Sequence, residues 1–392
     1  MNLFDDPILR NQLKPLTLTR PVGKLRIGIQ TIVEKWAYFY NDEIGFLTEE
    51  YLQKKFKVIS NSDLYVNASV LPNEEIWQAI NALTEGEALT KNGDFIAVRT
   101  SQNLSLNFEY QQFTQKEYPE NISIIKKLPD LFLQNAEQIT ADFKRITKGR
   151  ESQEIKDPFT RVYSPENVFL EDGADVKAAI INAENGPVYI GKNAVLQEGC
   201  LVIGPAAIGE NSMVAFGAKI RPNVTLGPVS RVGGEVGNSI FMGYSNKAHD
   251  GFLGNSVIGE WCNLGANTNN SNLKNDYKEV TLYDYNLGEL APTGEIFCGT
   301  FMGDYTKAGI STMFNTGTVI GVCSNVFGGD FQEKFIPSFT WGGKMAGYEN
   351  YRFDKAIDVI IATMSRRNLS LSEEDIEILR WVNVQKSVKK LT

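Results

Sequence analysis

The chain has 392 residues, of which 42% are hydrophobic and 22% charged, a composition typical of globular proteins long enough for two or three domains. Its formal net charge of −8 argues against a nucleic-acid partner or an anionic membrane surface. Asp5 and Asp6 stand where a secretory signal would be apolar, and no apolar run approaches the ~20 residues that span a bilayer. We therefore expect a cytoplasmic protein with no membrane partner.

Residues 1–110 alternate strand and helix patterns, which predicts a small α/β domain. We expect strands at residues 2–4, 63–70 and 94–99, helices at 27–40, 51–56 and 72–84, and a loop at 14–26. Residues 111–164 are then predicted to form a connector that contains one helix, at residues 129–147.

The next part of the chain repeats with a period of six, which neither a helix nor an amphipathic strand produces. A hexapeptide period is the signature of a parallel β-helix, whose coils stack aliphatic residues inward. Small or β-branched residues stand two places before each aliphatic residue. The aliphatic positions are Ile190, Leu196, Val202, Ile208, Val214, Ile220, Leu226 and Val232, then Ile296, Met302, Ala308, Phe314, Ile320 and Val326. We predict that the β-helix occupies residues 165–336.

Two segments, 235–257 and 267–293, interrupt this period. We expect both to be loops that leave the coils and form a binding face. Residues 337–392 are predicted to be a C-terminal segment, irregular over 337–351 and helical over 354–366 and 372–388. The cysteines have no metal-site spacing and are expected to be reduced thiols that pack in the core, at Cys200, Cys262, Cys298 and Cys323.

The chain's only histidine, His249, lies in the first interruption. A single histidine is often structural, but this one stands in a polar segment with glycines nearby. Its unperturbed pKa suits proton transfer near pH 7. An amide-rich stretch from Asn263 to Asn272 follows, and amides bind sugar hydroxyls. We therefore predict that His249 is the general base of an acyl transfer, with backbone N–H groups that stabilise the oxyanion.

Residues 235–278 resemble the acetyltransferase domain of the bifunctional bacterial and archaeal enzymes that make UDP-N-acetylglucosamine. The matching motifs are Ala248-His249-Asp250, Phe252-Leu253-Gly254-Asn255, Asn263-Leu264-Gly265-Ala266 and Ser271-Asn272 with Lys278. The resemblance implies a left-handed parallel β-helix, a homotrimer with sites between subunits, and acetyl-CoA as the donor. It assigns the general base to His249, substrate contacts to Arg221, Phe252, Asn263, Asn272 and Lys278, and acetyl-CoA contacts to Ala266, Asp304 and Val322.

Three positions depart from this family. Gly237 replaces a lysine that contacts the sugar, Phe252 replaces a tyrosine, and Asn255 replaces an aspartate. A site built to bond a hydroxyl rejects a partner that lacks it. The acceptor is therefore expected to be an amino-sugar phosphate related to glucosamine-1-phosphate.

The N-terminal stretch Pro15-Leu-Thr-Leu-Thr-Arg20-Pro21 resembles the start of the sugar-1-phosphate nucleotidylyltransferases. That resemblance implies a nucleotide site, and Mg²⁺ if the site is active. The basic residues expected to contact phosphates are Arg10, Lys14, Arg20, Lys24 and Lys35. The sequence departs from the family at residues 5–7, where glycines are expected, and at Val22 and Ser69, where a lysine and an aspartate are expected.

Three hypotheses remain open from the sequence. The first is an acetyltransferase that modifies an amino-sugar phosphate, with or without nucleotidyl transfer. The second is a nucleotidylyltransferase whose β-helix mainly forms the oligomer. The third is a scaffold that binds sugar nucleotides without turnover.

Overall fold

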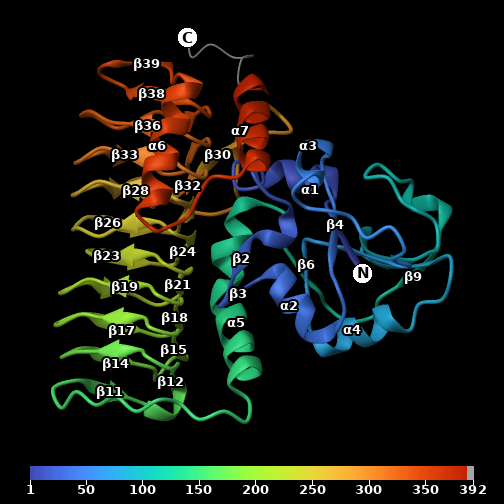
Figure 1. Cartoon of the computed structure of the whole chain (residues 1–392), viewed down its shortest axis with the longest axis horizontal. Coiled ribbons are helices and arrows are strands. Elements are labelled where there is room, and N and C mark those ends of the chain that lie inside the picture. The colour runs from blue at the N-terminus through green and yellow to red at the C-terminus, as the bar shows by residue number, and fades with distance from the viewer. Residues whose placement is uncertain (386–392) are drawn as a thin grey trace.

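The computed structural model describes residues 1–385. An N-terminal α/β domain lies beside an upright β-helix, and a long helix, α5 (Leu128–Thr147), stands between them (Figure 1). The predicted fold class, a small α/β domain followed by a parallel β-helix and C-terminal helices, is confirmed. No helix of the described residues is both long and apolar enough to cross a membrane.

The N-terminal domain contains a mixed six-stranded sheet in the order β4-β1-β5-β8-β7-β9. Its strands are β1 (Asn2–Phe4), β4 (Gly45–Leu47), β5 (Leu64–Asn67), β7 (Glu87–Lys91), β8 (Asp94–Arg99) and β9 (Thr114–Glu117). Its helices are α1 (Pro7–Gln12), α2 (Ile32–Phe39), α3 (Glu50–Gln53) and α4 (Glu74–Asn81). The sequence did not predict β4, β7 or β9, which are short. Because β9 pairs with β7, this sheet continues beyond residue 110.

The helix predicted at residues 27–40 begins later than expected. Residues 26–31 form a small hairpin of β2 (Arg26–Ile27) and β3 (Gln30–Thr31), with Gly28 at a φ of 70°. A positive φ is compatible with a turn but not with a helix. Thr31 and Glu34 then form a capping box that starts α2.

The β-helix has three sheets, which we name by their surroundings. The docked sheet, which faces the N-terminal domain, contains β12 (Val168–Leu170), β15 (Val188–Ile190), β18 (Ala206–Ile208), β21 (Val224–Leu226), β24 (Ser239–Gly243), β27 (Val257–Glu260), β32 (Thr300–Met302), β35 (Thr318–Ile320) and β37 (Phe335–Ile336). The groove sheet contains β13 (Asp175–Val176), β16 (Val195–Leu196), β19 (Met213–Val214), β22 (Arg231–Val232), β25 (Asn246–Lys247), β28 (Asn263–Leu264), β33 (Lys307–Ala308), β36 (Asn325–Val326), β38 (Thr340–Gly343) and β39 (Gly347–Asn350).

The third sheet, the open sheet, faces away from the N-terminal domain (Figure 1). It contains β11 (Arg161–Tyr163), β14 (Ile180–Asn182), β17 (Leu201–Ile203), β20 (Lys219–Ile220), β23 (Glu235–Gly237) and β26 (Phe252–Gly254). Two further strands pair separately, β29 (Asn269–Asn270) and β34 (Met313–Phe314).

The predicted inward positions are buried, with one exception. At the predicted inward positions, every residue from Ile190 to Val232 and from Met302 to Val326 is at most 4% exposed. Ile296 is 46% exposed because it lies in a segment that has left the coils, so the second run of hexads begins at Met302. All four cysteines are buried, as predicted, and none of them forms a disulfide with a described residue.

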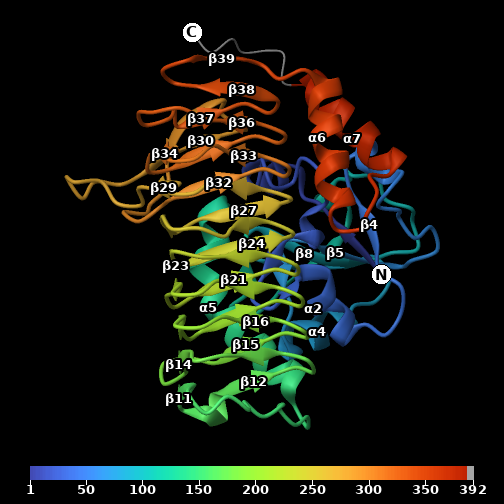
Figure 2. The same ribbon diagram turned by 60° about the vertical axis from the view of Figure 1, so that its left-hand side comes forward.

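The first interruption does not leave the β-helix, and this prediction is wrong. Residues 235–257 form β23 to β26 and the start of β27 (Figure 2). Ile208 pairs with Leu226, 18 residues later, whereas Leu226 pairs with Phe241, only 15 residues later. The coil is therefore shortened, and a deletion breaks the hexad phase just as an insertion does.

The second interruption is a true excursion, but it is shorter than predicted. Residues 269–270 remain in the coil as β29, and the excursion carries an antiparallel hairpin of β30 (Thr281–Asp284) and β31 (Glu289–Pro292). At the C-terminal end, β38 and β39 pair in a hairpin where an irregular segment was expected. The two predicted helices are α6 (Phe353–Ser365) and α7 (Glu373–Gln385); predicted helical residues 386–388 lie outside the described residues.

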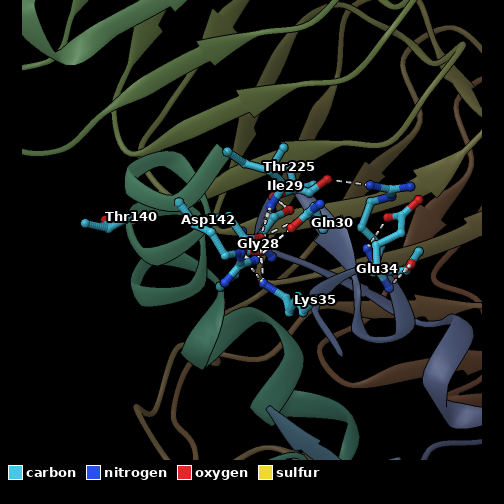
Figure 3. Close-up of polar contacts among 12 residues, drawn as sticks. Gly28, Ile29, Gln30, Glu34, Lys35, Thr140, Asp142 and Thr225 are labelled. Carbon is cyan, nitrogen blue, oxygen red and sulfur yellow. Dashed lines mark hydrogen bonds and ion pairs between the residues drawn. The ribbon is translucent and has the colours of Figure 1, made fainter. Parts of the chain in front are cut away.

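The docked sheet and the N-terminal domain share a buried polar contact. The Asn135 Oδ1 atom on α5 accepts hydrogen bonds from the Gly28 N–H (2.7 Å) and the Thr225 hydroxyl (3.1 Å). Asp142, about two turns further along the same face of α5, contacts the Lys35 ammonium and the N–H groups of residues 29 and 30 (Figure 3). These contacts fix the N-terminal domain against the docked sheet, and so leave the groove sheet and the open sheet uncovered by that domain.

Candidate functional site

The predicted base, His249, lies at the corner where the groove sheet turns into the open sheet. We call residues 248–251 the His249 corner. It follows β25 and precedes β26, and its imidazole is exposed. The side chain lines a groove of about 800 Å³ between the β-helix and α6. Asn263 and Ala266, two of the predicted contacts, line the same groove.

A lysine inside the β-helix supports this corner. Lys247 pairs in register with Val232, an inward position, and is 1% exposed. Its ammonium donates hydrogen bonds to the carbonyl oxygens of His249 (3.0 Å) and Gly233 (3.3 Å). Burial lowers the pKa of Lys247 to about 8, against the opposing effect of Asp250. A lysine at a core position lowers the free energy of unfolding. Lys247 therefore destabilises the fold while it holds the His249 backbone in place.

The groove carries a concentration of positive charge. Arg231 comes from β22, and Arg366 and Arg367 come from the C-terminal end of α6. None of the groove-lining residues in the described chain is acidic, and within residues 1–385 these arginines have no ion-pair partner. Burial, Arg231 and Arg366 together lower the pKa of Arg367. This end of the groove therefore favours an anion.

The predicted sugar contacts Arg221, Phe252 and Asn272 lie on the other side of the corner, on or beside the open sheet. Arg221 Nη1 lies 3.2 Å from Glu235 Oε1, and Asn272 Nδ2 donates to Asn255 Oδ1 at 2.8 Å. Glu235 and Phe252 are neighbours in register across β23 and β26. His249 thus stands between a cationic groove and a polar face.

The departures from the family at Gly237 and Asn255 have structural partners here. A Cβ atom at Gly237 would lie 3.1 Å from the Cβ of Arg221, so the missing side chain leaves room for that arginine. Asn255, in place of an aspartate, orients Asn272 through a neutral hydrogen bond. The polar face therefore differs from the family pattern in charge as well as in shape.

Three predicted residues lie elsewhere. Lys278 is exposed in the excursion and paired with Asp276 at 3.1 Å. Asp304 is 3% exposed and accepts hydrogen bonds from Thr19 and Arg20, which come from the N-terminal domain. Val322 is fully buried. Neither residue lines the groove beside His249: Val322 has no exposed surface, and Asp304 lines a separate cavity of about 260 Å³ together with Thr19 and Arg20.

The predicted phosphate contacts of the N-terminal domain do not form one site, although Arg20 and Lys24 line the same cavity. Arg10, Arg20 and Lys35 are buried in ion pairs, with Asp5 (3.2 Å), with Asp304 and Glu260, and with Asp142 (2.5 Å). Their charges are therefore neutralised internally. Lys14 and Lys24 remain, and they line two different cavities.

The residues that follow β1 do not form the phosphate-binding loop that the family has at residues 5–7. Asp5 is fully buried and accepts hydrogen bonds from the Val22 N–H (2.9 Å) and the Thr48 hydroxyl (2.5 Å), besides its pair with Arg10. Burial raises the pKa of Asp5 to about 6. Across residues 1–385, no cluster of three histidine, cysteine or acidic side chains is arranged to hold a metal ion.

Comparison with known proteins confirms the resemblance predicted from the sequence. Residues 1–151 match the family model of sugar nucleotidyl transferases. The Bifunctional protein GlmU of Methanococcus aeolicus is 38% identical over 106 residues, which cover 26% of this chain and 25% of that protein. The bifunctional sugar-1-phosphate nucleotidylyltransferase/acetyltransferase of Sulfurisphaera tokodaii is 30% identical over 163 residues, 41% of this chain and 38% of that protein.

The chain thus spans well under half the length of these two relatives. Among solved structures, the polySia-specific acetyltransferase NeuO is 14% identical with a TM-score of 0.29, over 55% of this chain and 97% of that one.

Sequence reasoning missed five cationic residues of the site: Arg231, Lys247, Lys307, Arg366 and Arg367. The adjacent arginines after α6 were visible, but nothing in the sequence placed that helix beside His249. Lys247 was hidden by the shortened coil, because only the observed pairing with Val232 shows that it occupies an inward position.

Proposed function

We propose that this protein transfers an acetyl group from acetyl-CoA to the amine of an amino-sugar-1-phosphate at the His249 corner. The observation that carries the proposal is the position of His249, which lines a cationic groove on one side and adjoins a polar face on the other. The two relatives named above as bifunctional proteins support it, and the second is named as an acetyltransferase.

The roles of the residues follow from their positions. The phosphates of coenzyme A bind Arg231, Arg366 and Arg367, and its thioester lies along Asn263–Ala266. The acceptor binds the polar face, with its phosphate at Arg221 and its hydroxyls at Asn272. Phe252 packs on the sugar ring. Lys278 lies on the exposed excursion, where it reaches a phosphate only by a movement of that segment.

The chemistry is an addition followed by an elimination. The acceptor nitrogen attacks the thioester carbonyl while His249 accepts a proton from that nitrogen. The C–S bond then breaks, and the leaving thiolate is protonated to give free coenzyme A. Lys247 keeps the His249 backbone in place, so it acts as a positioning residue.

The direct test is release of free thiol when acetyl-CoA is mixed with a panel of amino-sugar phosphates that includes glucosamine-1-phosphate. We expect release with at least one of them. The variant Arg366→Gln/Arg367→Gln is expected to raise KM for acetyl-CoA by about tenfold or more and to change kcat little, because charge-assisted contacts to a bound phosphate are lost.

Arg352→Gln is the matched control, since Arg352 precedes α6, is paired with Asp354 and does not line the groove. An unchanged KM in the double variant, or an increase of equal size in the control, would contradict the assigned donor site. No thiol release with any acceptor would contradict the function itself.

The match of residues 1–151 to the sugar nucleotidyl transferases favours a second candidate activity in the N-terminal domain. That activity, nucleotidyl transfer to a sugar-1-phosphate, is measured as pyrophosphate release from UTP or dTTP with Mg²⁺. The buried pairs of Arg10 with Asp5 and of Arg20 with Asp304 argue against it, because these two guanidinium charges are then not available to a phosphate. We accordingly expect no pyrophosphate above background. A homotrimer in the cytoplasm is part of the same proposal.

A further inference from the structure

A second cavity lies apart from the His249 corner, where four segments meet. They are the loop after α1, the hairpin of β30 and β31, the coil segment around β37, and α7. Its volume is about 360 Å³, at the lower end of the range for small-molecule sites, roughly 300–1,000 Å³. Its walls are largely aromatic, formed by Tyr283, Tyr285, Phe335 and Trp381.

These rings are held in place by stacking. Tyr283 stacks on Phe335 with ring centroids 3.6 Å apart and planes 9° apart. Trp381 stacks on Tyr51, with centroids 3.7 Å apart and planes 3° apart. Because these partners fix their orientation, the rings present a preformed surface for a planar ligand, and base–aromatic stacking is a common source of nucleotide affinity.

One cation, Lys14, lines the same cavity. Among residues 1–385 its ammonium has no hydrogen bond and no ion pair, and it lies 6.0 Å from the centroid of the Tyr285 ring. Burial lowers the pKa of Lys14 to about 8; Arg10 lowers it further, and Glu49 opposes both. A half-buried ammonium without a counter-ion is unfavourable until an anion joins it.

None of the described residues that line the cavity is acidic. A single positive charge in a lining without carboxylates suits one phosphate group and not a metal-bound triphosphate, whose magnesium ion takes carboxylate ligands. The aromatic walls and the single ammonium together are complementary to a ligand that has a planar ring at one end and one phosphate at the other.

We propose that this cavity binds a nucleoside monophosphate, with its base against the aromatic walls and its phosphate at Lys14. The acetyl-transfer site does not include this cavity, and of the predicted phosphate contacts of the N-terminal domain only Lys14 lines it. Because the ligand contacts the N-terminal domain, the β-helix and α7 at once, it stabilises their docking.

The test uses the whole protein and four probes: UMP, AMP, uridine and inorganic phosphate. Trp381 lines the cavity, so base stacking quenches tryptophan fluorescence. We expect UMP or AMP to quench it and to raise the melting temperature, uridine to act only at much higher concentration, and phosphate to leave the fluorescence unchanged. The proposal is overturned if neither nucleotide acts at millimolar concentration, or if uridine binds as tightly as UMP.

Three variants test whether nucleotide binding depends on the residues that line this cavity. Lys14→Met is expected to weaken binding of the active nucleotide by about tenfold or more, and to melt at a higher temperature than the wild type without ligand, because it removes an uncompensated charge. Lys334→Met is the matched control, since Lys334 is a partly buried lysine next to Phe335 that does not line the cavity. Trp381→Phe should remove the quenching but keep the thermal shift.

The affinity also depends on pH. Since the phosphate binds the charged form of Lys14, affinity should fall about tenfold per pH unit above pH 8 in the wild type, while Arg10 remains charged throughout. Nucleotide affinity that is equal in Lys14→Met and the wild type, or independent of pH between 7 and 9.5, refutes the assignment. Acetyl transfer at His249 is measured separately and does not depend on this result.

Discussion

Lys247 lowers the stability of the fold but positions the backbone of the proposed catalytic base. It occupies an inward position of the β-helix, where Val232 and Leu264 stand in the neighbouring coils. A buried lysine costs free energy unless its ammonium is well bonded, and here two carbonyl oxygens accept from it. One of these carbonyls belongs to His249, so the lysine that destabilises the core also holds the backbone of the proposed base.

We predict that Lys247→Met lowers kcat for acetyl transfer by about tenfold or more and changes KM for acetyl-CoA little, because the donor contacts lie on Arg231 and α6. Methionine keeps most of the volume, so the fold should persist. Lys91→Met is the control, since the Lys91 ammonium also donates to two backbone carbonyls, those of Tyr118 and Pro119, but lies in the N-terminal domain and does not line the groove. Equal loss of kcat in both variants would contradict the positioning role.

The same lysine predicts a pH dependence of stability. Its pKa is about 8 in the folded protein and 10.5 when exposed, so the unfolded chain binds more protons between these values. Stability contributed by Lys247 is therefore present at high pH and lost as pH falls through 8. The unfolding free energy of the wild type, relative to Lys247→Met, should rise by about 2 kcal/mol between pH 7 and 9.5 in urea titrations. A flat or falling difference would contradict the assigned pKa.

At the residue scale, sequence reasoning located the groove-lining residues His249, Asn263 and Ala266. It could do so because residues at a fixed spacing in successive coils lie next to one another in the β-helix. It failed for Lys35 and Asp304, since a charged side chain looks the same in sequence whether it meets a ligand or a buried partner. Only the three-dimensional contacts with Asp142 and Arg20 show that these charges are already neutralised.

Among the elements, helix α5 connects the N-terminal domain to the β-helix through its side-chain contacts. Its Asp142 is fully buried and accepts from the Lys35 ammonium at 2.5 Å and from the Ile29 N–H at 2.9 Å (Figure 3). Gly28 is required beside it, because a Cβ atom there would lie 2.6 Å from an Asp142 carboxylate oxygen. The helix, the β2–β3 hairpin and α2 thus form one unit.

Asp142→Asn should destabilise this unit by about 3–5 kcal/mol, because it leaves the Lys35 charge buried without a counter-ion. Asp175→Asn is the control, since its exposed pair with Lys177 contributes less than about 1 kcal/mol. Urea unfolding followed by circular dichroism measures both. A loss in Asp142→Asn no larger than in the control would show that the pair does not support docking.

The elements also show where the hexad period was informative. It predicted the inward ladder from Ile190 to Val232 in detail, because each coil has the same length there. It misread residues 235–257, since a shortened coil and an ejected loop both interrupt the phase. Length alone decides between them, and length is visible only once the strands are paired.

For the whole molecule, the three faces of the β-helix have different environments. The N-terminal domain covers the docked sheet, and α6 closes the groove beside the groove sheet (Figures 1 and 2). The open sheet carries the polar face and exposes apolar side chains, among them Ile180 (43%) and Leu201 (38%). If the protein forms the proposed trimer, this sheet is the face available for it.

We predict that Leu201→Asp reduces the mass measured by light scattering from that of a trimer to that of a monomer and abolishes acetyl transfer, with the fold retained. Ile361→Asp, which places the same charge at an exposed position on α6, should leave the mass unchanged. A trimeric Leu201→Asp protein would place the interface elsewhere, and a monomeric wild type would contradict the assembly.

The fold class and the presence of a β-helix followed from the sequence, because they depend on a repeated local pattern. The relation between the two domains did not, since it rests on single contacts between distant segments, such as Arg20 with Asp304 and Asn135 with Thr225. These contacts decide which predicted residues remain available to ligands.

The central claim is that His249 is the base of an acetyl transfer, and His249→Ala tests it most directly. In the thiol-release assay, with the acceptor that the wild type prefers, we expect kcat to fall by about a hundredfold or more while KM for acetyl-CoA stays near its wild-type value. A variant that keeps its full rate, or one that loses only acetyl-CoA affinity, would contradict the account.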